Sequence, residues 1–262
     1  MAIKFFKMEG TGNDFILLDD RKSQLNANDQ VFWAKMADRH LGVGADGIIF
    51  LKKDAQGVFE MVYLNSDGHQ VEMCGNGSRC FLQLIENLEG LAVGQEIKFK
   101  SYGALFRGQK DAQGLFHICL GLPSQVGKVP IQDLSQGAPA LYAFTGVPHA
   151  VFEKTNIDKI DLRAFAGPIR HDKRFAEGVN VNIFEQISPG VVKMRTFERG
   201  VEDETLSCGT GAVATALAYQ QFSKHQGAVT LQAPGGRLEV RFEAGQAWLS
   251  GPVGQVFEGI YL

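Results

Sequence analysis

Cys74-Gly75-Asn76-Gly77 and Cys208-Gly209-Thr210-Gly211 are two versions of one four-residue stretch, placed 134 positions apart in the chain. Each stretch comes before a run of residues with helical spacing, so we expect each cysteine at the start of a helix. The first N–H groups of a helix have no partner within it, and glycine lets a ligand approach them closely. The two stretches therefore predict two similar anion-binding helix starts.

The same offset of 134 positions recurs along the chain. A single glycine match would be weak evidence, because 31 of the 262 residues are glycine. A constant offset over separated segments is a stronger signal, and it predicts two copies of one α+β unit of roughly 125 to 130 residues, with the active cleft between them. The matched positions are Gly12 with Gly146, Gly44–Phe50 with Gly178–Phe184, Tyr63 with Phe197, and Asn65 with Arg199.

The local patterns predict strands with few helices in each copy. Residues 29–41 have helical spacing, with Trp33, Ala37 and Leu41 on one face and Gly42 as a stop signal. The apolar runs after both cysteine stretches predict one helix each, wrapped by sheet. Few helices among many strands indicate mostly antiparallel sheet. The predicted strands are 48–51, 59–64, 97–102 and 116–120.

Composition favours a small-molecule partner. The net charge is -3, from 26 basic and 29 acidic residues, and 45% of the chain is hydrophobic. This balance argues against nucleic acid and against an anionic membrane surface as partners. No apolar run approaches the roughly 20 residues of a membrane span. Because Lys4 and Lys7 interrupt any signal-type stretch, we expect a cytoplasmic protein.

Two other site types are not expected. The run Gly42–Gly47 has the GxGxxG pattern, but it follows a helical segment and precedes a strand, the reverse of a dinucleotide site. The histidines and cysteines lack zinc-type spacing, so no metal is expected. Four cysteines without a CxxC pair indicate reduced thiols, and Cys80 and Cys119 are expected in the core or on a helix face.

The two matched cysteines could carry acid–base chemistry. A helix start lowers the pKa of a thiol and favours the thiolate. Two opposed thiols beside a carboxylate held by Gly75–Gly77 and Gly209–Gly211 could remove a proton from one face of a Cα and return one to the other. The predicted reaction is therefore racemisation or epimerisation.

Polar residues in the same repeated segments are candidate assistants. His149 and Glu198 could set the protonation states of the thiols. Asn65, Asn180 and Arg199 could face the cleft, and Arg199 could bind a second carboxylate in a bidentate manner. Turn, cap or rim positions would explain the asparagines and the arginine equally simply.

Three motif groups resemble the diaminopimelate epimerases. They are Gly10–Phe15, Asn65–Gly68 running into Glu72–Cys80, and Glu198–Gly200 running into Glu204–Gly211. The likeness extends from near the N-terminus to Gly251. It implies an enzyme without pyridoxal phosphate or metal that interconverts LL- and meso-diaminopimelate for lysine and peptidoglycan synthesis.

The resemblance also implies an architecture and a set of site residues. The implied fold is α+β, with two pseudo-symmetric lobes from an internal duplication, each a mostly antiparallel sheet rolled around a central helix. We place the lobes at 1–122 with 253–262, and at 123–252, and we expect a homodimer. The implied acid/base pair is Cys74 and Cys208, with His149 and Glu198 assisting. The implied substrate contacts are Asn13, Asn65, Asn180, Glu198, Arg199 and the carboxylate cradle Gly75, Asn76, Gly209 and Thr210.

One departure keeps alternatives open. Val147 stands where many relatives have asparagine, and an apolar side chain cannot replace amide hydrogen bonds to the distal end of the substrate. A racemase of another amino acid is therefore the alternative enzyme. A non-catalytic amino acid binding protein is the alternative outside the enzymes. The stretch at Cys74 also lacks the histidine typical of the related proline racemases, which argues against a cyclic imino acid.

Overall fold

The computed structural model describes residues 2–128 and 131–262 as a mixed α+β protein with two compact units. The N-terminal unit comprises Met1–Ile118 and Ser250–Leu262, and the C-terminal unit comprises Cys119–Leu249. The chain passes between the units inside two strands, β8 (Phe116–Gly121) and β16 (Gln246–Gly251).

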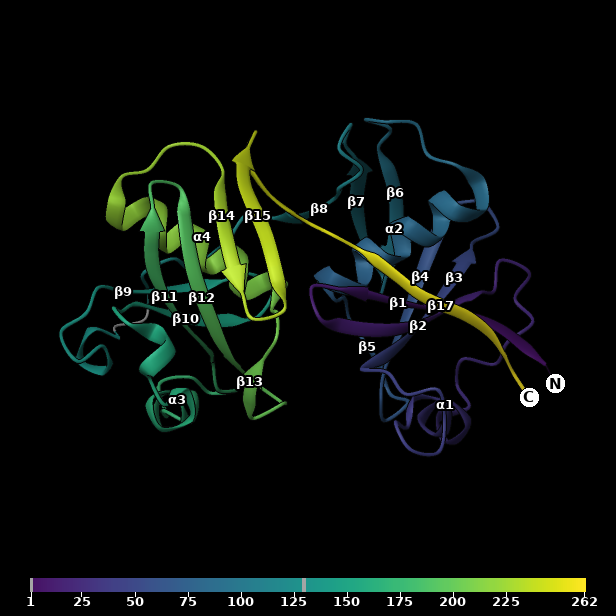
Figure 1. Cartoon of the computed structure of the whole chain (residues 1–262), viewed down its shortest axis with the longest axis horizontal. Helices are drawn as coiled ribbons and strands as arrows, with labels where there is room; N and C mark the ends of the chain where they lie inside the picture. The colour runs from purple at the N-terminus through teal and green to yellow at the C-terminus, as the bar shows by residue number, and fades with distance from the viewer. Residues whose placement is uncertain (1, 129–130) are drawn as a thin grey trace. The chain divides into compact units, whose positions relative to one another are not determined.

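The N-terminal unit is built mainly from antiparallel strand pairs (Figure 1). The antiparallel pairs are β1–β2, β1–β17, β3–β4, β4–β5 and β6–β7, whereas β2–β3 and β4–β6 are parallel. Its elements are β1 (Ile3–Gly10), β2 (Asn13–Asp19), α1 (Gln30–Ala37), β3 (Gly47–Lys53), β4 (Phe59–Asn65), β5 (Gln70–Val71), α2 (Gly75–Glu89), β6 (Ile97–Ser101), β7 (Ala104–Lys110) and β17 (Gly254–Tyr261).

The C-terminal unit has the same succession of pairings. Strands β10–β11 and β12–β14 are parallel, whereas β9–β10, β11–β12, β12–β13 and β14–β15 are antiparallel. Its elements are η1 (Gln132–Leu134), β9 (Ala140–Phe144), β10 (Pro148–Glu153), η2 (Ile157–Lys159), α3 (Leu162–Arg170), β11 (Asn180–Ser188), β12 (Val191–Glu198), β13 (Asp203–Thr205), α4 (Gly209–Ser223), β14 (Val229–Ala233) and β15 (Gly236–Glu243).

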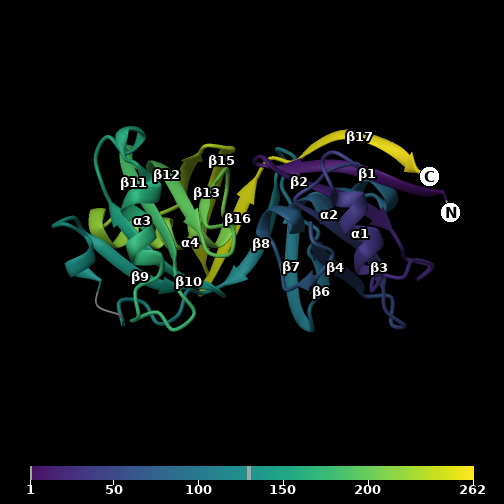
Figure 2. The ribbon, with the colours of Figure 1, turned by 90° about the horizontal axis from the view of Figure 1, so that it is seen from below.

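Helices α2 and α4 are the most deeply buried helices described in their respective units. Helix α2 packs against β1, β2, β3 and β7, and α4 packs against β9 to β12, β14 and β15 (Figure 2). The third residue of each helix is a glycine that lies close to a side chain of the neighbouring sheet. A Cβ at Gly77 would lie 2.8 Å from Ile49 Cδ1, and one at Gly211 would lie 2.5 Å from Asn182 Oδ1. Close packing thus fixes both helix starts against their sheets.

The sequence predictions are mostly confirmed, with one correction in α1. The helices after both cysteines are present, and the four predicted strands correspond to β3, β4, β6 and β8. Helix α1 ends at Ala37 instead of 41, because the Asp38 carboxylate accepts hydrogen bonds from the N–H groups of His40 and Leu41, both at 2.7 Å. Leu41 therefore leaves the buried face and is 75% exposed.

Candidate active site, one half in each unit

Cys74 and Cys208 are the N-cap residues of α2 and α4, as the sequence predicted. Their carbonyl groups accept the first helical hydrogen bonds, from Ser78 and Ala212, both at 2.8 Å. Neither cysteine side chain caps its helix. The N–H groups of the next three residues have no acceptor within the helix, and the helix dipole adds positive potential there. Each helix start is therefore suited to bind a carboxylate.

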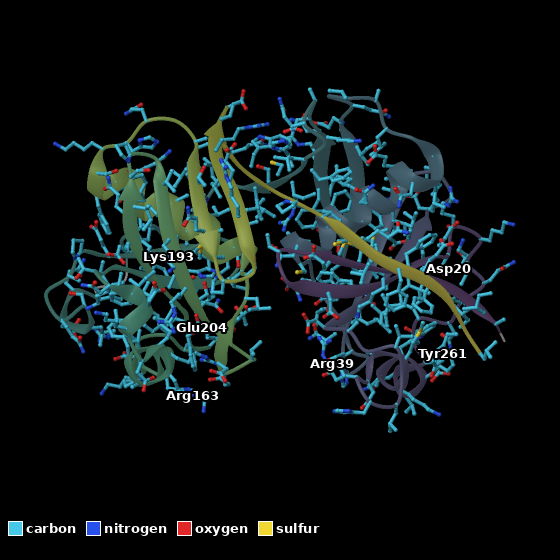
Figure 3. All side chains as sticks on the ribbon, viewed as in Figure 1. Asp20, Arg39, Arg163, Lys193, Glu204 and Tyr261 are labelled. Carbon is cyan, nitrogen blue, oxygen red and sulfur yellow. The ribbon has the colours of Figure 1, made fainter. Side chains whose placement is uncertain are left out.

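The Cys74 sulfur contacts an asparagine whose orientation is fixed. Cys74 Sγ lies 3.5 Å from Asn13 Oδ1, and Asn76 Nδ2 donates to the same oxygen at 3.4 Å. Asn13 Nδ2 donates to Asp46 Oδ2 at 2.5 Å. Asp46 is itself bound by Arg39 at 2.7 Å, and Arg39 is labelled in Figure 3. A carboxylate only accepts hydrogen bonds, so the Asn13 oxygen must face the thiol.

Arg79 is a buried cation behind the start of α2 that the sequence analysis did not single out. It is fully buried, and its guanidinium donates to Thr11 Oγ1 at 2.9 Å and to the Gly75 carbonyl at 3.5 Å. No carboxylate pairs with it among the described residues, and its Nε has no hydrogen-bond partner there. Burial lowers its pKa. In the sequence, the one sign of this buried cation is a charged residue placed directly before the apolar run of α2.

The Cys208 sulfur lies at the end of a hydrogen-bonded series of side chains. Thr210 Oγ1 lies 3.5 Å from Cys208 Sγ and 3.0 Å from His149 Nε2. Asn182 Nδ2 lies 2.9 Å from His149 Nδ1, and Thr196 Oγ1 donates to Asn182 Oδ1 at 2.9 Å. His149 is fully buried, and burial, with a contribution from the charge of Arg199, lowers its pKa to about 3. The histidine is therefore neutral, and it reaches the sulfur through Thr210.

The remaining predicted residues of the C-terminal unit cluster at the end of β12. Glu198 accepts a hydrogen bond from Thr205 Oγ1 at 2.9 Å. Arg199 Nη1 lies 3.4 Å from Glu177 Oε2, while its Nε and Nη2 make no hydrogen bond with the described residues. Asn180 is buried, and its amide binds the Pro148 carbonyl at 3.0 Å and the Arg199 N–H at 2.8 Å. In this structure Asn180 orients the backbone, whereas Arg199 can bind a ligand.

The predicted residue Asn65 stands at the end of β4 in the N-terminal unit. Its side chain is partly exposed and makes no hydrogen bond with the residues that the structure describes. Its amide is therefore open to a ligand. Cys80 and Cys119 are buried, as expected for core thiols, and burial raises the pKa of Cys80.

Residues 2–128 and 131–262 contain neither a candidate metal site nor a candidate membrane-spanning helix. No group of three or more His, Cys, Asp and Glu side chains in these ranges could hold a metal ion. No helix in the same ranges combines the length and apolar character needed to cross a membrane.

The chain is similar to known epimerases along nearly its full length. The sequence model named "Diaminopimelate epimerase" matches residues 5–103 and 141–255. The diaminopimelate epimerase of Flavobacterium psychrophilum is 36% identical, covering 98% of this chain and 99% of its own. That of Methanocella arvoryzae is also 36% identical, covering 98% of this chain and 96% of its own.

Solved structures with low sequence identity share the fold. A PhzF-family phenazine biosynthesis protein of Bacillus anthracis superposes with a TM-score of 0.75 at 15% identity, covering 100% of this chain and 99% of its own. A hydroxyproline epimerase of Agrobacterium vitis gives a TM-score of 0.64 at 14% identity, with 99% and 92% coverage. Together with the full-length sequence matches, the common fold leads to one assignment: the chain belongs to the diaminopimelate epimerase family, a family of isomerases.

Proposed function

We propose that this protein interconverts LL-2,6-diaminopimelate and meso-diaminopimelate by two-thiol proton transfer, without a cofactor or a metal. The observation that carries the proposal is the pair of cysteines at the N-caps of α2 and α4, each in a unit with the same succession of strand pairings. A pair of thiols at equivalent helix starts supplies both a base and an acid.

The proposed reaction moves one proton at a time. One cysteine thiolate takes the proton from the substrate Cα and becomes a thiol, while the other thiol gives its proton to the opposite face and becomes a thiolate. The electron pair left on Cα spreads onto the α-carboxylate. The N–H groups at Gly75–Asn76 and Gly209–Thr210 would bind that carboxylate more strongly as its charge grows. The cysteines exchange roles when the substrate configuration is reversed.

The mechanism requires the two units to bring both sulfurs to one substrate carbon. We propose that the chain forms two pseudo-symmetric lobes from an internal duplication, residues 1–122 with 253–262 and residues 123–252, with bounds close to those of the two compact units. Each lobe would be a mostly antiparallel sheet rolled around a central helix. The site would lie in the cleft between them. The equal lengths and equivalent cysteine caps of α2 and α4 support this proposal.

Recognition of the distal end of the substrate is assigned to residues that differ between the units. Arg199 has two unbound guanidinium nitrogens that can bind a second carboxylate. Asn65, at the matched position, offers an amide. Asn13 and Glu198 would complete the contacts, with Asn180 holding Arg199 in place. The apolar Val147 favours one alternative, a racemase that does not bind a distal amino acid group.

Deuterium exchange tests the reaction directly. Incubation with LL-diaminopimelate in D2O, without pyridoxal phosphate and with a chelator present, should place deuterium at Cα and yield the meso isomer. Absence of exchange would reject the proposed epimerase activity and favour the alternative of a non-catalytic amino acid binding protein. Faster exchange with an amino acid that lacks the distal carboxylate would instead establish the alternative racemase.

Oxidation tests the required approach of the two units. If Cys74 and Cys208 reach one carbon, their sulfurs come close enough to form a disulfide when no substrate intervenes. Activity should then fall in air and return with dithiothreitol, and peptide mapping should recover the Cys74–Cys208 cross-link. Oxidant-insensitive activity would contradict the shared site.

Assembly and location are proposed from the family resemblance. We expect a homodimer in the cytoplasm, and light scattering at several protein concentrations measures the mass in solution. A mass of 28.6 kDa, that of one chain, at all concentrations would contradict the dimer.

A further inference from the structure

We infer that Asn182 and Thr196 are positioning residues that act through His149 and Thr210 to make Cys208 the thiolate of the substrate-free protein, while Cys74 carries the proton. The inference rests on the proposed function, because it states which cysteine is ready to act as the base. It follows from the direction of each hydrogen bond in the two units.

The first step is the orientation of Asn182. This residue lies directly opposite Thr196 in the register of β11 and β12, and Thr196 Oγ1 donates to Asn182 Oδ1 at 2.9 Å. The amide nitrogen of Asn182 therefore faces His149. An amide nitrogen only donates, so His149 Nδ1, at 2.9 Å, must accept.

The second step is the proton on the ring of His149. The ring is fully buried, and among the residues that the structure describes it makes hydrogen bonds only to Asn182 and Thr210. Burial keeps it neutral, with a pKa of about 3. A neutral ring has one N–H, and because Nδ1 accepts, the proton is on Nε2 and is donated to Thr210 Oγ1 at 3.0 Å.

The third step is the direction of the hydrogen bond between Thr210 and the Cys208 sulfur. The Thr210 hydroxyl has one proton, and its oxygen already accepts from His149. Its remaining hydrogen-bond partner is Cys208 Sγ at 3.5 Å. Because no other acceptor for the hydroxyl proton is present among the described residues, we infer that Thr210 donates to Cys208. A donated hydrogen bond stabilises a thiolate over a thiol.

Cys74 has the opposite arrangement. Asn13 directs its nitrogen to the Asp46 carboxylate, so it presents only its carbonyl oxygen to Cys74 Sγ at 3.5 Å. A carbonyl oxygen accepts from S–H and repels a thiolate. This contact therefore favours the protonated form of Cys74.

Charged groups lie on the elements around both helix starts. Arg79 is close enough to Cys74 and to Glu9 to interact electrostatically with each of them. Asp46 holds the Asn13 amide nitrogen by a hydrogen bond. Arg79 favours an anion at Cys74, but its guanidinium donates to Thr11 and Gly75 and not to the sulfur. In the C-terminal unit the charge of Arg199 acts on His149. Glu198, the last residue of β12, comes directly before Arg199 in the chain.

Alkylation of the substrate-free protein tests the inference. The rate of iodoacetamide modification of each thiol is followed from pH 5 to 10 by peptide mass spectrometry, and the pH midpoint is compared instead of the rate, because exposure affects only the rate. Cys208 should have a midpoint at least one pH unit below that of Cys74. An equal or higher midpoint for Cys208 would overturn the inference.

Four variants test the positioning residues. Thr196→Val has nearly the same shape and should raise the Cys208 midpoint, as should Asn182→Leu. Thr210→Val should raise it most, by about tenfold in proton affinity, and Thr210→Ser should restore it. The Cys74 midpoint is the internal control and should stay unchanged. If Thr196→Val and Thr210→Val are folded and the alkylation midpoint of Cys208 is unchanged in both, the proposed positioning role is rejected.

The two proposals can fail separately. Alkylation needs no substrate, whereas the proposed function is tested by deuterium exchange into diaminopimelate. If deuterium exchange occurs but Cys74 has the lower alkylation midpoint, only the assignment of the thiolate to Cys208 is rejected. If Cys208 has the lower midpoint but no exchange occurs, only the proposed reaction is rejected.

Discussion

The starts of α2 and α4 have the same backbone but different surroundings. In the N-terminal unit the buried Arg79 and the amide of Asn13 surround the cysteine, whereas in the C-terminal unit a neutral histidine and a threonine do so. The offset of 134 positions pairs Arg79 with Val213 and His149 with Phe15, and both apolar counterparts are buried. The comparison teaches that a symmetric framework can give two matched thiols different hydrogen-bond partners.

The largest expected effect comes from removing either thiol. Cys74→Ser and Cys208→Ser should each reduce epimerisation by roughly 10²- to 10⁴-fold, because serine is a poor acid and base at neutral pH. Formation of meso product from LL-diaminopimelate measures the loss. Cys119→Ala is the matched control and should keep nearly full activity. One serine variant with normal activity would break the functional equivalence of the two units.

Arg199 and Asn65 occupy matched positions but should contribute differently to binding. Arg199→Met should lower kcat/KM for diaminopimelate by about 10- to 100-fold, because a hydrogen bond to a charged group contributes roughly 1.5 to 3 kcal/mol. Asn65→Ala should lower it by about fivefold, as expected for a neutral hydrogen bond of roughly 1 kcal/mol. Steady-state kinetics measure kcat/KM for both variants. Equal losses of kcat/KM would contradict the prediction and indicate symmetric recognition.

His149 should make stability depend on pH. Its folded pKa of about 3 lies below the usual value near 6.5, so the unfolded chain binds one more proton between these values. The free energy of unfolding is therefore unaffected by the protonation of His149 above pH 6.5. Between pH 6.5 and about 3 it falls by about 1.4 kcal/mol for each pH unit, because protonation favours the unfolded chain. Urea unfolding at pH 7, 6 and 5 should show a smaller pH dependence for His149→Gln. The exposed His40→Gln control should retain the original slope.

The smallest expected effect on stability is at Arg79. In Arg79→Met the loss of hydrogen bonds to Thr11 and Gly75 is offset by relief from burying a guanidinium without a carboxylate, so the free energy of unfolding should change by less than about 2 kcal/mol. The alkylation midpoint of Cys74 should rise, because a nearby positive charge is removed, while that of Cys208 stays constant. A larger loss of stability with no shift at Cys74 would make Arg79 purely structural.

Much of the fold was predictable because local patterns and the repeat agreed. The apolar runs fixed the helices after both cysteines, and alternating or apolar runs fixed strands such as β3 and β4. The end of α1 was not predictable from spacing, because Asp38 forms a competing turn with the following N–H groups. The hydrogen bonds of Asn180 were also not predictable from local patterns, since its amide binds backbone groups of two neighbouring segments.

By itself the sequence determined that two cysteines begin two equivalent helices, because glycines and apolar spacing act within a few residues of each cysteine. Only the tertiary structure decided what each sulfur contacts. Asn182, Thr196 and His149 meet because β10, β11 and β12 pair in one register, and Asn13 meets Cys74 because β2 packs against α2. Hydrogen-bond direction depends on such distant partners, so the difference between the thiols is a property of the folded chain.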